Sequence, residues 1–199
     1  MKSFPLLCLA FLFLTAVGAQ AADDGGHFAI KGAGLMDCRQ YTTARTQKSP
    51  VVYSLLGWLD GYITAQNELS PDTFDVAAWE STDLFSRILD SHCRDHPDDR
   101  FFSVVRSVVT EIRARRLKKD SPLIPVRNGN DVMVLYQETL RRAQAALAKL
   151  GLYDGEADGQ FSDQTERALA LFQSKNGIKA TGLPDQVTLW RLFRPSSDQ

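Results

Sequence analysis

The fold of this chain is decided by residues 153–192, which read YDGEADGQFSDQTERALALFQSKNGIKATGLPDQVTLWRL. Glycine supplies the positive φ that tight turns require, so Gly155 and Gly159 indicate a loop at the start of the stretch. Ser162 is a preferred residue for capping a helix N-terminus, and Gly177 is the residue type that ends helices in the left-handed conformation. The stretch therefore predicts a helix between these two caps, with one stripe formed by Thr165, Leu169 and Phe172.

Two further helices complete this C-terminal unit. Asp185 is placed to cap a short helix near the end of the chain. Upstream, apolar residues recur at helical spacing over residues 136–150, and Gly151 closes that pattern. We therefore expect a compact three-helix unit over residues 132–194, followed by a tail of residues 195–199.

This pattern resembles the small peptidoglycan-binding domain that is often appended to bacterial cell-wall hydrolases. The similarity covers residues 132–194, about a third of the chain. It implies a three-helix fold and binding to the stem peptide of peptidoglycan. The matching positions are Gly151, Tyr153, Gly155, Asp158, Gly159, Phe161, Ser162, Thr165 and the run from Phe172 to Leu189.

The resemblance suggests where a wall fragment would bind. A stem peptide presents carboxylates and amides, and the helix that begins after Ser162 presents free backbone N–H groups that favour an anion. Asp163 partly opposes that attraction. Tyr153 and Phe161 could flank the peptide, although Phe161 would equally serve as a core plug beneath the loop. The predicted binding residues are Tyr153, Asp158, Gly159, Phe161, Ser162 and Gln173, with Arg167 as an alternative hydrogen-bond donor to Gln173.

The N-terminus has the features of a secretory signal peptide. Lys2 precedes an apolar run that extends to Val17, and AQA at residues 19–21 is a small-x-small cleavage pattern. The run is far shorter than the roughly 20 residues that a transmembrane anchor needs. We therefore expect residues 1–21 to be removed, the protein to reach the periplasm or cell envelope, and the mature chain to have no membrane span.

Charge and cysteine content narrow the partners and the compartment. The chain carries 23 basic and 24 acidic side chains, whereas nucleic-acid binding calls for a basic excess. Removal of the leader takes away Cys8 and leaves Cys38 and Cys93. Exported proteins usually pair such cysteines, so we predict a disulfide. A metal site and a reactive thiol are the alternatives, and the absence of a CxxC motif disfavours the former.

The N-terminal half also reads as helical. After a Gly-rich lead at residues 22–34, apolar residues recur at helical spacing over 49–67, over 82–93, and from Pro97 to Ile112. We expect a disulfide-bridged helical domain over residues 35–119, and thus an all-α, two-domain protein.

A basic run and a Pro-containing segment separate the two halves. We expect the run to decorate a helix C-terminus, where cations favour the macrodipole, and the segment at residues 120–131 to be a stiffened linker with a polar turn at its end. The alternative is an electrostatic handle for acidic envelope polymers or anionic lipid. The run consists of Arg113, Arg115, Arg116, Lys118 and Lys119.

The N-terminal half resembles a second group of exported helical proteins. These are the HdeA acid-stress chaperone and the Rap1a and Tai immunity proteins, which neutralise a secreted amidase that attacks peptidoglycan. The similarity spans about residues 35–117 and implies either chaperone or toxin-neutralising activity. The matching positions are Cys38, Trp58, Gly61, Tyr62, Ala65, Asn67, Cys93 and Pro97.

The sequence lacks the motifs of wall-degrading enzymes. His92 and His96 are four apart, but HCRDH lacks the glutamate of HExxH and no third ligand is evident, so we expect solvated loop histidines and no metal. Neither remaining cysteine has the Ser-His-Gly-Cys setting of an L,D-transpeptidase. The acidic residues between Asp154 and Asp158 are expected to form a solvated turn.

We therefore predict an exported, non-enzymatic protein without a cofactor. Its C-terminal unit would bind peptidoglycan and tether the helical half at the cell wall. The alternative is a periplasmic acid-stress chaperone or an immunity protein against a peptidoglycan amidase. A wall hydrolase or a toxin protein is a possible partner in addition to peptidoglycan.

Overall fold

The computed structural model describes residues 22–23 and 25–194, so the predicted signal peptide and C-terminal tail lie outside the described residues. Contacts divide the chain into a unit that ends at Ile30 and a unit that begins at Lys31. In the first unit, the Asp23 carboxylate accepts hydrogen bonds from the backbone N–H groups of Gly25 and His27. The second unit contains all of the helices and strands described below.

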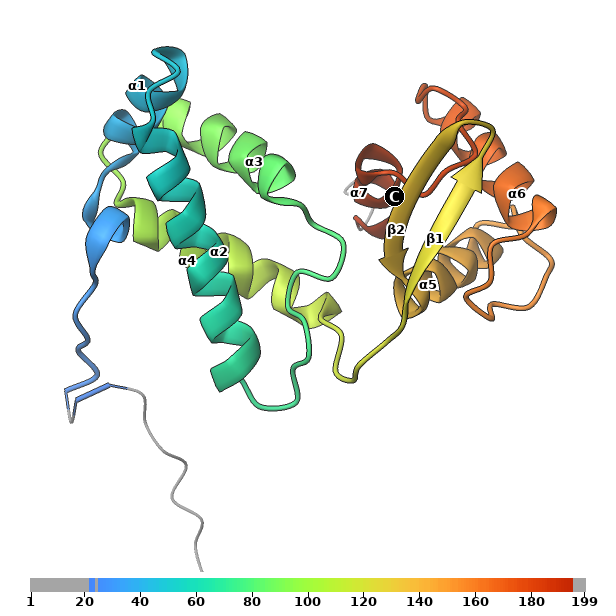
Figure 1. The fold of residues 1–199 in the computed structure, drawn as a ribbon, viewed down its shortest axis with the longest axis horizontal. Helices are drawn as coiled ribbons and strands as arrows, with labels where there is room; N and C mark the ends of the chain where they lie inside the picture. The colour runs from blue at the N-terminus through green and yellow to red at the C-terminus, as the bar shows by residue number, and fades with distance from the viewer. Residues whose placement is uncertain (1–21, 24, 195–199) are drawn as a thin grey trace, which may run out of the picture. The chain divides into compact units, whose positions relative to one another are not determined.

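The second unit is mostly helical, as predicted (Figure 1). Helices expected near residues 49–67, 82–93, 136–150, after Ser162 and after Asp185 are all present. Among the described residues, no helix is long and apolar enough to span a membrane. The elements are η1 (Gly32–Leu35), α1 (Cys38–Thr46), α2 (Val51–Leu69), α3 (Thr82–Asp95), α4 (Phe101–Ile112), η2 (Arg113–Arg115), β1 (Leu123–Asn128), β2 (Asp131–Tyr136), α5 (Gln137–Lys149), α6 (Asp163–Lys175) and α7 (Gln186–Phe193).

Helix α1 was not predicted, and α4 begins later than expected. A capping box starts α1: the Asp37 carboxylate accepts from the Gln40 N–H, and the Gln40 side chain accepts from the Asp37 N–H. The backbone N–H of Cys38 then donates to the carbonyl of Asp99 at 2.9 Å. Residues 97–100 therefore make backbone contacts with the start of α1. These contacts explain why α4 starts at Phe101 rather than at Pro97.

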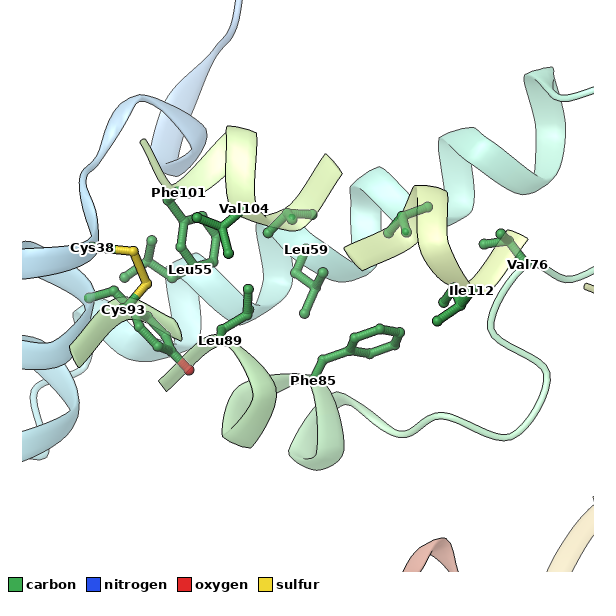
Figure 2. Close-up of a cluster of buried hydrophobic side chains, with 13 residues drawn as sticks. Cys38, Leu55, Leu59, Val76, Phe85, Leu89, Cys93, Phe101, Val104 and Ile112 are labelled. Carbon is green, nitrogen blue, oxygen red and sulfur yellow. A yellow bond between two sulfur atoms is a disulfide. The ribbon is translucent and has the colours of Figure 1, made fainter. Parts of the chain in front are cut away.

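The helical half has its own hydrophobic core, drawn from α1 to α4 (Figure 2). Leu55 and Leu59 of α2, Leu89 of α3 and Phe101 of α4 are almost completely buried. The predicted Cys38–Cys93 disulfide is confirmed, with an S–S distance of 2.01 Å. Figure 2 shows the disulfide at one end of the cluster and Val76 with Ile112 at the other. The bridge ties the start of α1 to the end of α3.

A β-hairpin replaces most of the predicted linker. Residues 123–128 form β1, which pairs antiparallel with β2, so the all-α expectation omitted this sheet. The polar turn predicted at its end is the hairpin turn, where Gly129 has φ 55°. Exposed and more buried side chains alternate along both strands: Val126 and Leu135 are buried, and they pack on Leu140. Pro125 is tolerated because the sheet has only two strands, and both are edges.

The three C-terminal helices enclose a second core. Leu147 of α5, Leu169 of α6 and Leu189 of α7 are buried in it. Phe161 packs against this cluster and also against the cluster beneath the hairpin. Figure 1 shows the hairpin beside α5, consistent with the contacts between β2 and α5.

Several cations of the basic run are used within the chain. Arg116 and Lys118 both approach the Asp72 carboxylate, at 3.4 and 2.6 Å. The Lys118 hydrogen bond is the main reason that the pKa of Asp72 lies below its ordinary value. Arg115 lies 3.7 Å from a carboxylate oxygen of Glu80. These pairs favour the structural interpretation of the run over an electrostatic handle.

Candidate functional site

A buried glutamine holds the first turn of the C-terminal unit. Gln144 of α5 has no exposed surface, and its Oε1 accepts a hydrogen bond from the backbone N–H of Gly159 at 2.7 Å. Its Nε2 donates to the carbonyl of Gln160 at 2.9 Å and to the hydroxyl of Thr165 at 3.1 Å. One side chain therefore satisfies three polar groups of the loop and fixes the loop to the helix.

A second buried glutamine holds the second turn in the same way. The Oε1 of Gln173 accepts from the backbone N–H of Gly182 at 2.8 Å. Its Nε2 donates to the carbonyl of Leu183 at 2.9 Å and to the hydroxyl of Thr188 at 2.8 Å. Gln173, like Gln144, has no exposed surface.

The two turns are therefore copies of one arrangement. Gly159 has φ 75° and Gly182 has φ 67°, values that favour glycine. Three residues after each glycine comes a helix cap, Ser162 or Asp185, and three residues later a buried threonine whose N–H donates to that cap. The sequence signal for Gln144, which we missed, is a polar residue on the apolar face of a helix, four positions after Leu140.

The structure gives most of the predicted binding residues a role inside the protein. Gln173 has no exposed surface, so its donor is used internally and is not offered to a ligand. Tyr153 is buried and donates to the carbonyl of Glu156 at 2.9 Å. Gly159 is buried. Phe161 is half-buried and packs against both hydrophobic clusters of the C-terminal unit.

Two of the predicted residues remain open to solvent. Ser162 is exposed although its hydroxyl caps α6. Asp158 is exposed as well, and its Oδ1 accepts from the backbone N–H of Gln160 at 2.8 Å. Asp158 and Ser162 are thus the members of the predicted set that a ligand can reach directly.

A groove of about 500 Å³ lies beside the first turn. Its floor is fixed because the backbone N–H of Gln137 donates to the carbonyl of Pro122 at 2.8 Å, and the N–H of Glu138 donates to the hydroxyl of Ser121 at 3.0 Å. Its charged lining has both signs. The cations are Lys118, Lys119, Arg141 and Arg142, and the carboxylates are Asp120, Glu138 and Asp158.

Arginine side chains hold Glu138 in this groove. Arg141 donates two hydrogen bonds to the carboxylate, at 2.6 and 2.8 Å, and Arg142 donates a third at 2.9 Å. The Arg141 hydrogen bond is the main reason that the pKa of Glu138 is lowered, and the same contact raises the pKa of Arg141. Lys119 is exposed and adds a positive charge at the edge of the groove.

The histidines differ from the prediction in position. His92 lies in the last turn of α3 rather than in a loop, because the helix continues to Asp95. Its Nε2 is 2.8 Å from a carboxylate oxygen of Asp99, and its ring contacts that of His96. Within the described part of the chain, no group of three or more His, Cys, Asp or Glu residues is placed to hold a metal ion.

Comparison with known proteins identifies the C-terminal unit. Residues 136–192 match the family model described as "Putative peptidoglycan binding domain". The family match confirms the resemblance stated for residues 132–194 and shows that this part of the chain is a peptidoglycan-binding-like domain. The resemblance of residues 35–119 to HdeA and to Rap1a or Tai stays a prediction.

The chain is also similar to a larger cell-wall protein. It is 33% identical over 117 residues to the N-acetylmuramoyl-L-alanine amidase CwlM of Mycobacterium tuberculosis. The aligned part covers 58% of this chain but 29% of the relative, so the chain spans less than a third of that protein's length. No solved structure matches the chain significantly.

Proposed function

We propose that this protein is exported, has no enzymatic activity of its own, and binds peptidoglycan through its C-terminal unit. The observation that carries the proposal is the family match over residues 136–192. The signal-peptide pattern of residues 1–21 supports placement in the periplasm or cell envelope, where peptidoglycan is accessible.

The groove beside the first turn suits a stem peptide. Such a peptide carries carboxylates, amides and amines, and the groove offers cations, carboxylates and backbone groups within one depression. Lys119 would pair with a peptide carboxylate. The second carboxylate oxygen of Asp158, Oδ2, would accept a hydrogen bond from an amide or an amine. The first turn, which Gln144 holds in place, keeps this side of the groove rigid, and rigidity lowers the entropic cost of binding.

The two halves together suggest a tether. The helical half has its own core and a disulfide, and wall binding by the C-terminal unit would concentrate it near peptidoglycan. The tethered half would then act on a partner that is itself at the wall.

The alternative is an immunity protein against a peptidoglycan amidase, or an acid-stress chaperone, with the C-terminal unit as a spacer. The disulfide in the helical half supports this alternative, because HdeA and the Rap1a and Tai proteins, which this half resembles, are exported helical proteins. An immunity protein would inhibit one amidase at equimolar amounts, whereas a chaperone would suppress aggregation of an acid-denatured client. A hydrolase accessory subunit would instead co-purify with an active wall enzyme.

The test of the groove is sedimentation of the mature chain with purified sacculi. We expect Lys119→Glu to weaken binding about fivefold because it reverses a charge at the edge of the groove. Lys175→Glu, the same change on α6 outside the groove lining, should bind like wild type. Equal binding by all three chains would refute the groove as the binding site.

A further inference from the structure

A second cavity, of about 290 Å³, shares Arg141 and Arg142 with the groove described above. One wall is aromatic: the rings of Trp79 and Phe193 are 5.6 Å apart and tilted by 57°. Ala145 and Ala146 of α5 extend this apolar surface. The cavity therefore has a surface against which an apolar group can be buried.

The aromatic wall is held in place by Gln186 at the start of α7. Its Nε2 donates to the carbonyl of Trp79, and its Oε1 accepts from the backbone N–H of Ser81 at 3.0 Å. The Ser81 hydroxyl lies 3.1 Å from the same oxygen. Residues 79–81 are thus fixed against α7, and the cavity is formed before any ligand arrives.

Apart from Thr139, the remaining lining is cationic. Arg115, Arg141, Arg142 and Lys149 all contribute, and no carboxylate lines the cavity. Glu138 neutralises only part of this charge, because the one carboxylate is shared by Arg141 and Arg142. Lys149 is exposed at the end of α5, where it is free to contact a bound group.

An unsatisfied buried pair lies beside the cavity. The side chain of Glu80 is 2% exposed, and its Oε1 has no hydrogen-bond partner. The nearest guanidinium nitrogen of Arg115 is 3.7 Å away, which is beyond hydrogen-bond distance, and the Arg115 Nε is buried without a partner too. Buried polar groups are normally satisfied. Glu80 therefore does not use all of the Arg115 donors, and the exposed part of the Arg115 side chain lines the cavity, where it can contact an anion.

We propose that this cavity binds an amphipathic anion, namely a phosphate or carboxylate carried on a short apolar chain. The apolar chain lies against Trp79 and Phe193, and the anionic group contacts Arg115 and Lys149. At about 290 Å³ the cavity is at the lower limit of small-ligand pockets, so the apolar chain of the ligand must be short. This site shares Arg141 and Arg142 with the proposed wall-binding groove, but Lys119 and Asp158 line only the groove, and Lys149 lines only the cavity.

Isothermal titration of the full mature chain with n-octyl phosphate tests the proposal. Inorganic phosphate and 1-octanol serve as probes that lack one half of the ligand, and both should bind at least tenfold more weakly. Hexyl phosphate should bind about fifteenfold more weakly than octyl phosphate, because each buried methylene contributes about fourfold. Saturation at one molecule per chain is expected.

Variants locate the site. Lys149→Glu should weaken octyl phosphate binding about tenfold or more, whereas Lys175→Glu, the same change in the last turn of α6, should not alter it. Ala145→Leu, which fills the cavity, should abolish binding while the far-UV spectrum is unchanged. Octyl phosphate binding that Lys149→Glu leaves intact would overturn the proposal, as would equal binding of 1-octanol or of inorganic phosphate. Sedimentation with sacculi should be unaffected by Lys149→Glu, so the two proposals fail separately.

Discussion

The side-chain oxygen of Gln173 accepts a 2.8 Å hydrogen bond from the backbone N–H of Gly182, and this contact lies wholly inside the protein. The equivalent contact joins Gln144 to Gly159 at 2.7 Å. Gln173, which the sequence suggested as a hydrogen-bond donor to a ligand, therefore stabilises a turn instead. The ligand-facing surface of the C-terminal unit must be sought among exposed residues beside these turns.

Replacement of Gln173 tests this structural role. Gln173→Leu keeps the size of the side chain but leaves the Gly182 N–H without an acceptor, so the free energy of unfolding should fall by about 3 kcal/mol. Gln164→Leu is the control, because Gln164 donates to the exposed Asp154 carboxylate and loss of this surface hydrogen bond should change stability by less than about 0.5 kcal/mol. Urea unfolding followed by circular dichroism measures both. Equal midpoints for the two variants would contradict the assignment.

The first turn requires glycine for two reasons. A Cβ on Gly159 would lie 2.6 Å from the carbonyl oxygen of Gln137, and its φ is 75°. Gly177 has a similar φ of 67° but open space around it. Gly177→Ala should therefore cost about 1 kcal/mol from the backbone alone, and Gly159→Ala about 3 kcal/mol from backbone and overpacking together. Urea midpoints that rank the two variants in the opposite order would disprove this reading.

The disulfide should stabilise the helical half. It closes a loop of 55 residues, which in the chain-entropy model contributes about 4 kcal/mol. A Cys38→Ser, Cys93→Ser double variant should lower the urea midpoint of that half, and dithiothreitol should lower the wild-type midpoint to the same value. An unchanged midpoint after complete reduction would show that the bridge is dispensable.

Glu80 should make stability depend on pH. Burial raises the pKa of this carboxyl from 4.5 to about 7, and nearby Asp75 adds to the rise while Arg115 opposes it. The folded state therefore holds the proton more tightly than the unfolded state, so stability should decrease as pH rises from about 4.5 to about 7 and then level off. The change is of order 3 kcal/mol.

Glu80→Gln provides the matched measurement for this effect. The amide cannot ionise, so unfolding free energies of the variant should lack the decline attributed to Glu80 and should exceed those of wild type at pH 8. Parallel pH profiles for the two proteins, from urea unfolding between pH 4 and 8, would rule out Glu80 as the source.

The sequence predicted the helices and caps well because their signals are local. Ser162, Asp185 and Gly177 each act within one turn of chain, and all three have the predicted role. The hairpin was missed because Pro125 and the flanking polar residues resemble a linker. Its strands are fixed by burial of Val126 and Leu135 in a cluster that also contains Leu183, a residue distant in the sequence.

The candidate site was harder to predict than the fold. Tyr153, Phe161 and Gln173 stand out in the sequence because the turns need them, and residues that maintain a turn cannot be told from residues that contact a ligand by spacing alone. The groove depends on Pro122 and Ser121 meeting the start of α5, and only the tertiary structure brings them together.

The central claim is that the chain binds the stem peptide of peptidoglycan. The most direct test is sedimentation of the full mature chain with intact sacculi, with either purified stem peptides or peptide-free glycan strands added as competitors. The account predicts that the chain pellets with sacculi and that stem peptides, but not glycan strands, release it. A folded chain that stays in the supernatant, or one that only glycan strands release, would contradict the account.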